Sequence, residues 1–319
     1  DSYNTAVGYA AGSAVTTGTH NTLIGGLAGD ALTTGASNVA VGYGALTTDD
    51  VGQHNVAIGR DALSAQNIAT AANTYNTAVG YAAGSAVTTG VNNTLIGGLA
   101  GDAITTGNAN TGLGSSALTA VNTGINNVGL GEGAGYNITS GNSNIIIGKD
   151  ITAASATADS QLNIGGWIIG STGQITMPLQ PAFSVAKNAM QSNIAVGSTV
   201  AVTWQTEIFD QNADFASNTF TAPVGGRYQF NVEMRFTGVD SAAGYVQTHL
   251  LTSNRNYEVD LLDPTQFNGD LTYYTASSSF LVDMDASDTA SVSVFQSGGS
   301  AQLDIGYGGD SYFSGYLVC

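Results

Sequence analysis

The chain has few of the residues that would give it a disulfide framework, a nucleic-acid surface or a membrane span. Its 319 residues include one cysteine, four prolines and six basic residues, and 9% are charged. A single cysteine cannot form a disulfide within the chain. A formal net charge of −17 with six scattered cations leaves no basic patch, so binding to phosphate backbones is not expected. No apolar run is long enough to insert into a bilayer, and no signal peptide is recognisable.

The two chain ends carry separate expectations. Cys319 is the last residue. It is either an incidental terminal thiol, which we favour, or one arm of an interchain disulfide at a threefold axis. Because Asp1 already lies within a repeat of the kind described below, we expect a longer N-terminal region that contacts other proteins.

A short repeat dominates the first half of the chain. An Asn followed by small or apolar residues and a Gly recurs nine times from Asn4 to Asn144, with seven gaps of 17 residues and one of 21. A longer period of 72 residues overlies it, because residues 3–38 and 75–110 differ at five of 36 positions. Self-similarity at a fixed short period is typical of a solenoid, in which stacked units bury each other's apolar faces.

Each repeat is predicted to form one coil of a β-solenoid, or β-roll. A phrase such as Asn-Thr-Ala-Val-Gly offers about five residues of strand, a second apolar patch follows, and Thr-Thr-Gly makes a corner. Gly supplies positive φ at the corners, and no helical spacing is present. Stacked coils would align the Asn side chains into hydrogen-bonded ladders. Residues 1–150 are therefore predicted to form a shaft, on the order of 40 Å long at ~4.8 Å per coil.

A column of such coils has a thin core, so three chains side by side would bury more apolar surface than one. We expect Leu46, Leu63 and Leu118, in the second apolar patch, to lie on an inter-chain face. The repeat resembles the NTAVG or NSVAIG repeats of trimeric bacterial adhesin heads and of phage tail-fibre shafts. That resemblance covers residues 1 to about 150 and implies a homotrimeric fibre, whose longer N-terminal region we expect to contact other fibre or tail proteins.

Residues 151–180 are predicted to be a capping coil and a linker. Gln161 to Gly170 has the pattern of a degenerate last coil, in which Trp167 and Ile168 would form the lid. Pro178 and Pro181 then mark a linker.

Residues 181–319 have a different pattern, with runs of five to eight residues that alternate apolar and polar side chains. About eight such strands predict a jelly-roll β-sandwich. Three blocks, residues 181–185, 220–230 and 312–318, resemble the globular head of the complement q-subcomponent and its tumour-necrosis-factor-like relatives. The resemblance implies a ten-stranded jelly roll that trimerises and recognises ligands through the loops at its far end. It places these side chains on the inner face or the trimer seam: Phe220, Tyr228, Phe230, Phe313 and Tyr316.

Candidates for catalysis are weak, and the chain is not expected to be an enzyme. Its three His are scattered and form no Ser-His-Asp or Cys-His pattern. Residues 129–135 are glycine-rich like a phosphate loop, but they lie in register with the eighth repeat and have no nearby Lys. Asp30, Asp61 and Asp102 recur at equivalent turns, which suits solvent-facing corners better than the carboxylate pair of a polysaccharide-cleaving enzyme.

No cofactor is expected, with calcium as the one alternative. Asp283, Asp285 and Asp288 lie within six residues of each other. Some relatives of the complement-q type bind calcium through carboxylate and carbonyl oxygens. The favoured interpretation of these acids is a solvated turn between two strands.

Recognition by the head is predicted to use segments rich in Tyr, Asn and Asp, because planar aromatics stack on sugars and amides hydrogen-bond to them. We expect Tyr257, Asn268 and Tyr273 to be exposed. The candidate receptor-binding residues are Asn256, Tyr257, Asn268, Asp270, Tyr273, Tyr274 and Tyr307.

Taken together, these patterns predict an all-β homotrimer with a β-solenoid shaft and a jelly-roll head. The predicted function is that of the distal part of a phage tail fibre in the virion. It would attach the virion to a host surface glycan or protein receptor by non-covalent binding. One alternative is a secreted or cell-surface bacterial adhesin or structural fibre. The second alternative is a polysaccharide depolymerase, a tailspike.

Overall fold

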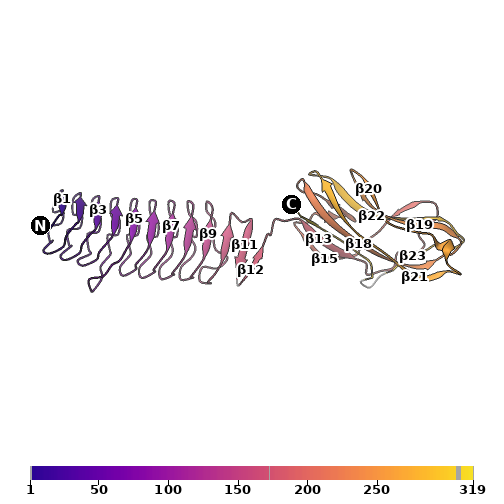
Figure 1. Ribbon diagram of the computed structural model, residues 1–319, viewed down its shortest axis with the longest axis horizontal. Helices are drawn as coiled ribbons and strands as arrows, with labels where there is room; N and C mark the ends of the chain where they lie inside the picture. The colour runs from indigo at the N-terminus through magenta and orange to yellow at the C-terminus, as the bar shows by residue number, and fades with distance from the viewer. Residues whose placement is uncertain (1, 172, 307–309, 319) are drawn as a thin grey trace. The chain divides into compact units, whose positions relative to one another are not determined.

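The computed structural model describes residues 2–171, 173–306 and 310–318, which fall into two compact units, Asp1–Pro178 and Leu179–Cys319 (Figure 1). Both units are built from β-strands. The described residues contain no α-helix and therefore none that could span a membrane, and their helical element is the 3-10 turn η1 (Pro264–Gln266).

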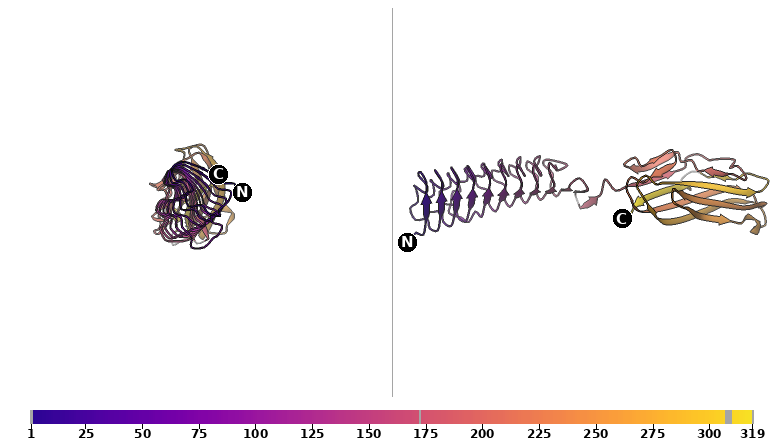
Figure 2. Two further views of the ribbon diagram at one scale, coloured as in Figure 1. Left: turned by 90° about the vertical axis from the view of Figure 1, so that its left-hand side faces the viewer. Right: turned by 90° about the horizontal axis from the view of Figure 1, so that it is seen from above.

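The first unit is a β-solenoid in which every coil contributes one short parallel strand (Figures 1 and 2). Neighbouring strands pair in register, so that Thr94 lies opposite Thr111 and Ile96 opposite Leu113. Each strand has three residues, shorter than the predicted five, because the flanking Asn and Gly belong to the corners. The strands are β1 (Thr5–Val7), β2 (Thr22–Ile24), β3 (Val39–Val41), β4 (Val56–Ile58), β5 (Thr77–Val79), β6 (Thr94–Ile96), β7 (Thr111–Leu113), β8 (Val128–Leu130) and β9 (Ile145–Ile147).

The repeated Asn forms the predicted ladder. The amide nitrogen of Asn93 donates to the carbonyl of Gly107 across its own coil at 2.9 Å, and its side-chain oxygen accepts from the backbone N–H of Asn110 in the next coil at 3.0 Å. The ladder residues Asn38, Asn55, Asn76, Asn93, Asn110, Asn127 and Asn144 are fully buried. Each therefore satisfies backbone groups that the narrow coil would otherwise leave unpaired, which is why the repeat retains Asn.

The expectation that Leu46, Leu63 and Leu118 lie on an inter-chain face is wrong. All three have positive φ and are fully buried inside the coils, not on an inter-chain face. Leu118 fills space left by small residues, since a Cβ on Gly129 would lie 2.8 Å from its Cγ. Leu99 also has a positive φ and is 37% exposed, so the position of these three residues within the coil directs their side chains inward, which the repeat spacing alone does not reveal.

The coil with the 21-residue gap and the coil before it share a polar interruption of the core. Asp49 and Gln66 occupy the column that holds Val15, Leu32 and Val87 in other coils, and both are fully buried. The Gln66 amide donates to Asp49 at 2.6 Å, and the Gly52 N–H donates to the same carboxylate at 3.0 Å. Burial raises the pKa of Asp49.

The shaft ends in a hairpin rather than under a tryptophan lid. β10 (Leu162–Ile164) continues the parallel stack, and β11 (Ile168–Ser171) and β12 (Gln174–Thr176) then add antiparallel. Ile168 pairs within this hairpin, but Trp167 lies at its turn and is 72% exposed, so the expectation that it covers the core is wrong. The antiparallel reversal itself ends the column, because it removes the parallel edge on which a further coil would stack.

The second unit is a β-sandwich of two antiparallel sheets, each with six strands (Figure 1). The first sheet contains β15 (Thr206–Gln211), β13 (Ala182–Ala186), β24 (Tyr312–Leu317), β18 (Gly226–Val239), β21 (Leu271–Met284) and β23 (Asp304–Ile305). The second contains β16 (Phe215–Ala216), β17 (Thr219–Thr221), β22 (Thr289–Gly298), β19 (Ala243–Thr252), β20 (Asn256–Leu262) and β14 (Thr199–Ala201). The sandwich has two strands more than the resemblance implies, because short pieces such as β16 and β23 pair with the main sheets.

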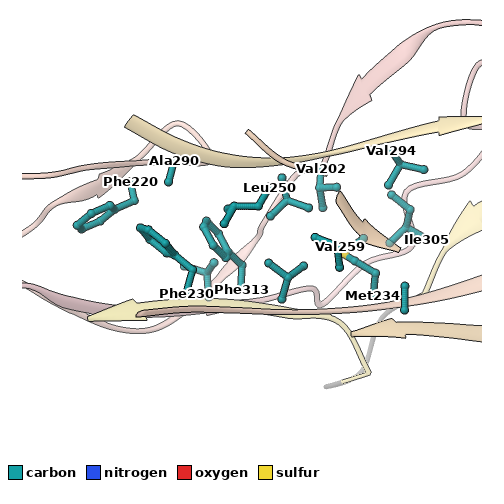
Figure 3. Packing of buried hydrophobic residues seen from close by; sticks show 14 of the residues in the cluster. Val202, Phe220, Phe230, Met234, Leu250, Val259, Ala290, Val294, Ile305 and Phe313 are labelled. Atoms are coloured by element: carbon teal, nitrogen blue, oxygen red, sulfur yellow. The ribbon is translucent and has the colours of Figure 1, made fainter. Parts of the chain in front are cut away.

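Aromatic and aliphatic side chains from both sheets meet between them, as Figure 3 shows. Phe220, Tyr228, Phe230 and Phe313 are fully buried, with the rings of Phe220 and Phe230 5.7 Å apart. Tyr316 lies on the outer face and is 46% exposed. The alternation of β24 accounts for this difference, because Phe313 and Tyr316 are an odd number of residues apart and face opposite sides.

Candidate recognition site

The pairing of two long strands builds a pocket at one end of the first sheet. Thr237 lies opposite Tyr273 and Val239 opposite Leu271, where β18 ends and β21 begins. The pocket has a volume of about 560 Å³, within the range of small-ligand sites. Its lining residues are Met190, Arg235, Thr237, Gly238, Asp270, Leu271, Thr272, Tyr273, Gly306 and Asp310.

Arg235 is the central side chain of the pocket. Its guanidinium carbon lies 4.2 Å from the centre of the Tyr273 ring, a cation–π contact, and its Nη1 pairs with the Asp310 carboxylate. The backbone carbonyl of Arg235 accepts from the Gly306 N–H at 2.7 Å. A guanidinium held from two sides presents its remaining N–H groups in a defined direction. A ligand that binds these groups therefore costs less side-chain conformational entropy than one that must first order a free arginine.

Asp270 stands at the rim and is held by the turn after β18. The Ser241 N–H and hydroxyl donate to one oxygen of Asp270 at 2.9 and 2.8 Å. The other carboxylate oxygen has the lone pairs that accept a hydroxyl proton. Met190 adds an apolar rim residue that is 42% exposed.

This combination suits a ligand with both apolar faces and hydroxyl groups. An exposed tyrosine ring can contact the C–H face of a sugar, Asp270 and Asp310 can accept from hydroxyls, and Arg235 can donate. The two carboxylates outnumber the one guanidinium, so the pocket favours a neutral or cationic ligand over an anionic one.

Some of the residues expected from the sequence lie together here. Asp270 and Tyr273 line the pocket, and Tyr273 is 59% exposed. Asn268 is exposed in the loop just before it. Tyr307 lies outside the described residues.

The other candidates lie apart from the pocket. Asn256 and Tyr257 are on β20 in the second sheet, where Tyr257 is half-buried, with its ring 5.3 Å from that of Phe280. Tyr257 is therefore not exposed as expected. Tyr274 follows Tyr273 but points to the opposite side of β21, where burial and the neighbouring Asp260 carboxylate raise its pKa to about 12. A half-buried, hydrogen-bonded tyrosine of this kind contributes to packing.

Sequence reasoning missed Arg235 and Met190, and it placed Asp310 in a recognition segment without indicating its pairing with Arg235. Arg235 is one cation within an ordinary alternating strand, and its partner Asp310 is 75 residues away along the chain. No local pattern indicates such a pair. The available signal was weak: Arg235 is one of only six basic residues in the chain.

The three acids considered for calcium do not gather. Asp288 accepts from the Asp285 N–H at 2.8 Å and from the Asn254 amide at 2.5 Å, and the bond from the Asp285 N–H lowers its pKa. Its carboxylate therefore closes the turn between β21 and β22. Across the part of the chain that the structure describes, no group of three or more His, Cys, Asp or Glu side chains could hold a metal ion. Calcium binding at Asp283, Asp285 and Asp288 stays a prediction without geometric support.

The head has relatives among known proteins, and the chain as a whole matches no curated protein. The family described as C1q domain matches residues 182–318. The globular domain of zebrafish complement 1qA is 21% identical and covers 44% of this chain and 98% of its own, with a TM-score of 0.33. Murine APRIL is 10% identical and covers 44% of this chain and 99% of its own, with a TM-score of 0.32. Domains of the C1q and tumour-necrosis-factor type are typically trimeric. Residues 182–318 therefore match the C1q domain family, and they follow a β-solenoid shaft.

Proposed function

We propose that this protein is the distal part of a trimeric phage tail fibre that attaches the virion to a glycan on the host surface. The observation that carries the proposal is the pocket of Arg235, Tyr273 and Asp270 on a head that follows a repetitive shaft. A regular stack of short coils suits a spacer. A pocket with an aromatic ring and fixed polar groups suits non-covalent recognition of a sugar.

Three copies of such a head would give useful affinity from weak single sites. Each pocket is open and modest in size, so one site alone would bind a sugar weakly. Linking three sites raises the effective concentration for the second and third contacts. In this proposal the protein binds and does not catalyse.

Binding of the full-length protein to intact candidate host cells tests the proposal. Tyr273→Ala and Arg235→Ala should each lower cell binding by about tenfold or more, because each removes a central pocket contact. Tyr136→Ala is the matched control, since it removes a tyrosine that is 45% exposed on the shaft. Equal binding by all four proteins would overturn the assignment of the pocket.

The same preparation separates the alternatives. Release of reducing ends from host polysaccharide would identify a depolymerase, and it should not be observed. Antibody labelling should place the protein on virions. Labelling of bacterial surfaces in a culture free of phage would instead support a cellular adhesin.

A further inference from the structure

The loop that leads into β21 contains the one Asn-Gly pair of the sequence, Asn268 and Gly269. Both residues are exposed and lie between η1 and the first residue of the strand. Neither the side-chain amide of Asn268 nor the N–H of Gly269 forms a hydrogen bond with the part of the chain that the structure describes. The amide carbonyl of Asn268 and the backbone nitrogen that follows it are therefore not held apart by other partners.

Gly269 leaves the approach to that carbonyl open. Its φ is 135°, and a Cβ placed on it would meet no heavy atom within 4 Å. Glycine has no side chain to shield its own nitrogen, and it adopts backbone conformations that other residues rarely reach. An exposed loop also samples such conformations at low cost. The pair therefore combines two groups that react with each other with the freedom to bring them together.

We propose that Asn268 is a modification site, where the amide is lost and part of the product has a lengthened backbone. In the first step the nitrogen of Gly269 attacks the side-chain carbonyl carbon of Asn268. A C–N bond forms and the C–NH₂ bond breaks, and the amide group leaves as ammonia with the proton of the attacking nitrogen. Water then opens the five-membered succinimide ring, and no atom is oxidised or reduced.

The ring can open at either of its two carbonyls. Hydrolysis at the side-chain carbonyl gives Asp at position 268. Hydrolysis at the original backbone carbonyl gives isoaspartate, in which the backbone runs through the side chain and contains one more carbon. Both products carry a negative charge where Asn268 was neutral.

The chain is anchored on both sides of the pair. Before it, the Phe267 N–H donates to the carbonyl of Pro264 at 3.1 Å. After it, Asp270 accepts from the N–H and the hydroxyl of Ser241 at 2.9 and 2.8 Å. Two residues separate these anchors, so a carbon added at position 268 has to be accommodated by moving one of them.

Asp270 is the anchor that moves. The turn η1 is closed by further bonds, because Asp263 accepts from the Thr265 N–H at 3.0 Å and from the Gln266 amide at 2.9 Å. Asp270 is held at its side chain only by Ser241, at an exposed position. The added charge has a smaller effect than the added carbon, because solvent and salt screen exposed charges. Isoaspartate at position 268 therefore displaces Asp270, which lines the pocket.

Asn142 in the shaft provides an internal comparison, since it also precedes a small residue, Ser143. Its amide nitrogen donates to the Asp159 carboxylate at 3.0 Å, and its side-chain oxygen accepts from the Ile125 N–H at 2.9 Å. These bonds fix the amide between neighbouring coils. Asn142 should therefore keep its amide under conditions in which Asn268 loses it.

Peptide mass mapping of the full-length protein, stored at mildly alkaline pH, tests the modification. Most chains should lose the amide at Asn268, with both Asp and isoaspartate as products, and Asn142 should stay intact. Asn268→Gln is the matched control, because its longer side chain would have to form a six-membered ring, and it should keep its amide. Loss of the amide at Asn268 no faster than at Asn142 would overturn the modification site.

Hydrogen exchange of the Ser241 N–H tests the displacement of Asp270. Exchange should be faster in stored wild type that contains isoaspartate and unchanged in stored Asn268→Gln. Asn268→Asp has the charge without the extra carbon and should exchange like fresh wild type. Equal exchange before and after conversion would overturn the displacement. Exchange in Asn268→Asp as fast as in the stored protein would overturn the role of the extra carbon.

The effect of this modification on recognition rests on the proposed function, but neither readout above uses cell binding. If fresh wild type binds candidate host cells, stored wild type should bind less, and stored Asn268→Gln should bind as before. Equal binding by fresh and converted wild type would overturn the effect on recognition. Fresh protein that binds no cells would overturn the proposed function, and conversion at Asn268 would still support the modification site.

Discussion

At the scale of single residues, the shaft depends on glycines that let neighbouring coils approach each other. Gly97 has a φ of 136°, and a Cβ there would lie 2.4 Å from the carbonyl oxygen of Gly114 in the next coil. The next residue, Gly98, would place a Cβ in open space. Position 97 therefore has no room for a side chain and position 98 does, although the two glycines are adjacent in the sequence.

Gly97→Ala should lower the free energy of unfolding of the shaft by ~2 kcal/mol or more, because it combines a strained φ with a backbone clash. Gly98→Ala, the control, should change it little or raise it slightly, since Ala restricts the unfolded chain. Thermal unfolding followed by circular dichroism measures both. Equal effects of the two substitutions would contradict the close approach of the coils.

Asp240 gives the head a dependence on acid pH. Its carboxylate accepts from the backbone N–H groups of Ala242 and Ala301 at 2.8 Å each, and these bonds lower its pKa from 3.8 to about 2. A carboxyl with a lowered pKa in the folded state stabilises the fold above its unfolded pKa and loses that contribution as the pH falls.

The wild-type head should therefore lose stability between pH 4 and pH 2 as Asp240 becomes protonated. Asp240→Asn should be less stable than wild type at neutral pH and show a weaker dependence across that window. Denaturant unfolding at several pH values compares the two proteins. Parallel pH profiles for wild type and Asp240→Asn would argue against this role of Asp240.

At the scale of elements, the irregular coil shows how an insertion is accommodated. In most coils the N–H of the corner Gly donates to a carbonyl of the next coil, as Gly35 does to Asp50. The Gly52 N–H, which faces the coil that holds the extra residues, donates instead to the side chain of Asp49 at 3.0 Å. The polar pair Asp49 and Gln66 is therefore explained by the insertion beside it.

Asp49→Leu, which restores the aliphatic residue of the column, should lower the free energy of unfolding of the shaft by ~1–3 kcal/mol, because it leaves buried donors unpaired. Asp49→Asn keeps one acceptor oxygen for Gly52 and should cost less. Chemical denaturation of both variants provides the comparison. A gain in stability for Asp49→Leu would mean that restoring the apolar column outweighs the lost hydrogen bonds.

The strands of the head show that the sequence predicts the alternation of side chains along a strand but not which side faces the core. Tyr273 and Tyr274 are neighbours, and a strand must turn them to opposite sides. The pattern alone does not say which side is the core. The pairing of β21 with β18 decides it, by placing Tyr273 beside Arg235 and Tyr274 toward the second sheet.

At the scale of the whole molecule, the chain has two separate hydrophobic cores. Leu95 belongs to the shaft core and Phe230 to the head core, and the two clusters share no residue. Both side chains are fully buried. Each core can therefore be weakened by itself.

Leu95→Ala should destabilise the shaft by ~2–5 kcal/mol, and Phe230→Ala should destabilise the head by ~3–5 kcal/mol, through the lost burial and the cavity left behind. Differential scanning calorimetry of the full-length protein should show two transitions, with each substitution lowering one of them. Both transitions moving together in either variant would show that the two cores unfold as one.

The sequence by itself determined the period, the all-β class, the parallel stacking of coils and the Asn ladder. These follow from local rules, because a 17-residue phrase with Gly corners and β-branched residues leaves few other ways to satisfy its backbone. It also indicated the sandwich of the head through alternation and three short blocks.

Tertiary structure alone decided which way side chains point and which distant residues meet. Leu46, Leu63 and Leu118 are apolar and periodic, yet they lie inside the coils beside the buried middle residues of the strands, and the first and third strand residues are the more exposed ones. Arg235 and Asp310 meet because the backbone brings residues 75 positions apart to one end of a sheet. Side-chain direction depends on local φ and ψ, and long-range pairing depends on strand register, and neither is encoded in spacing along the chain.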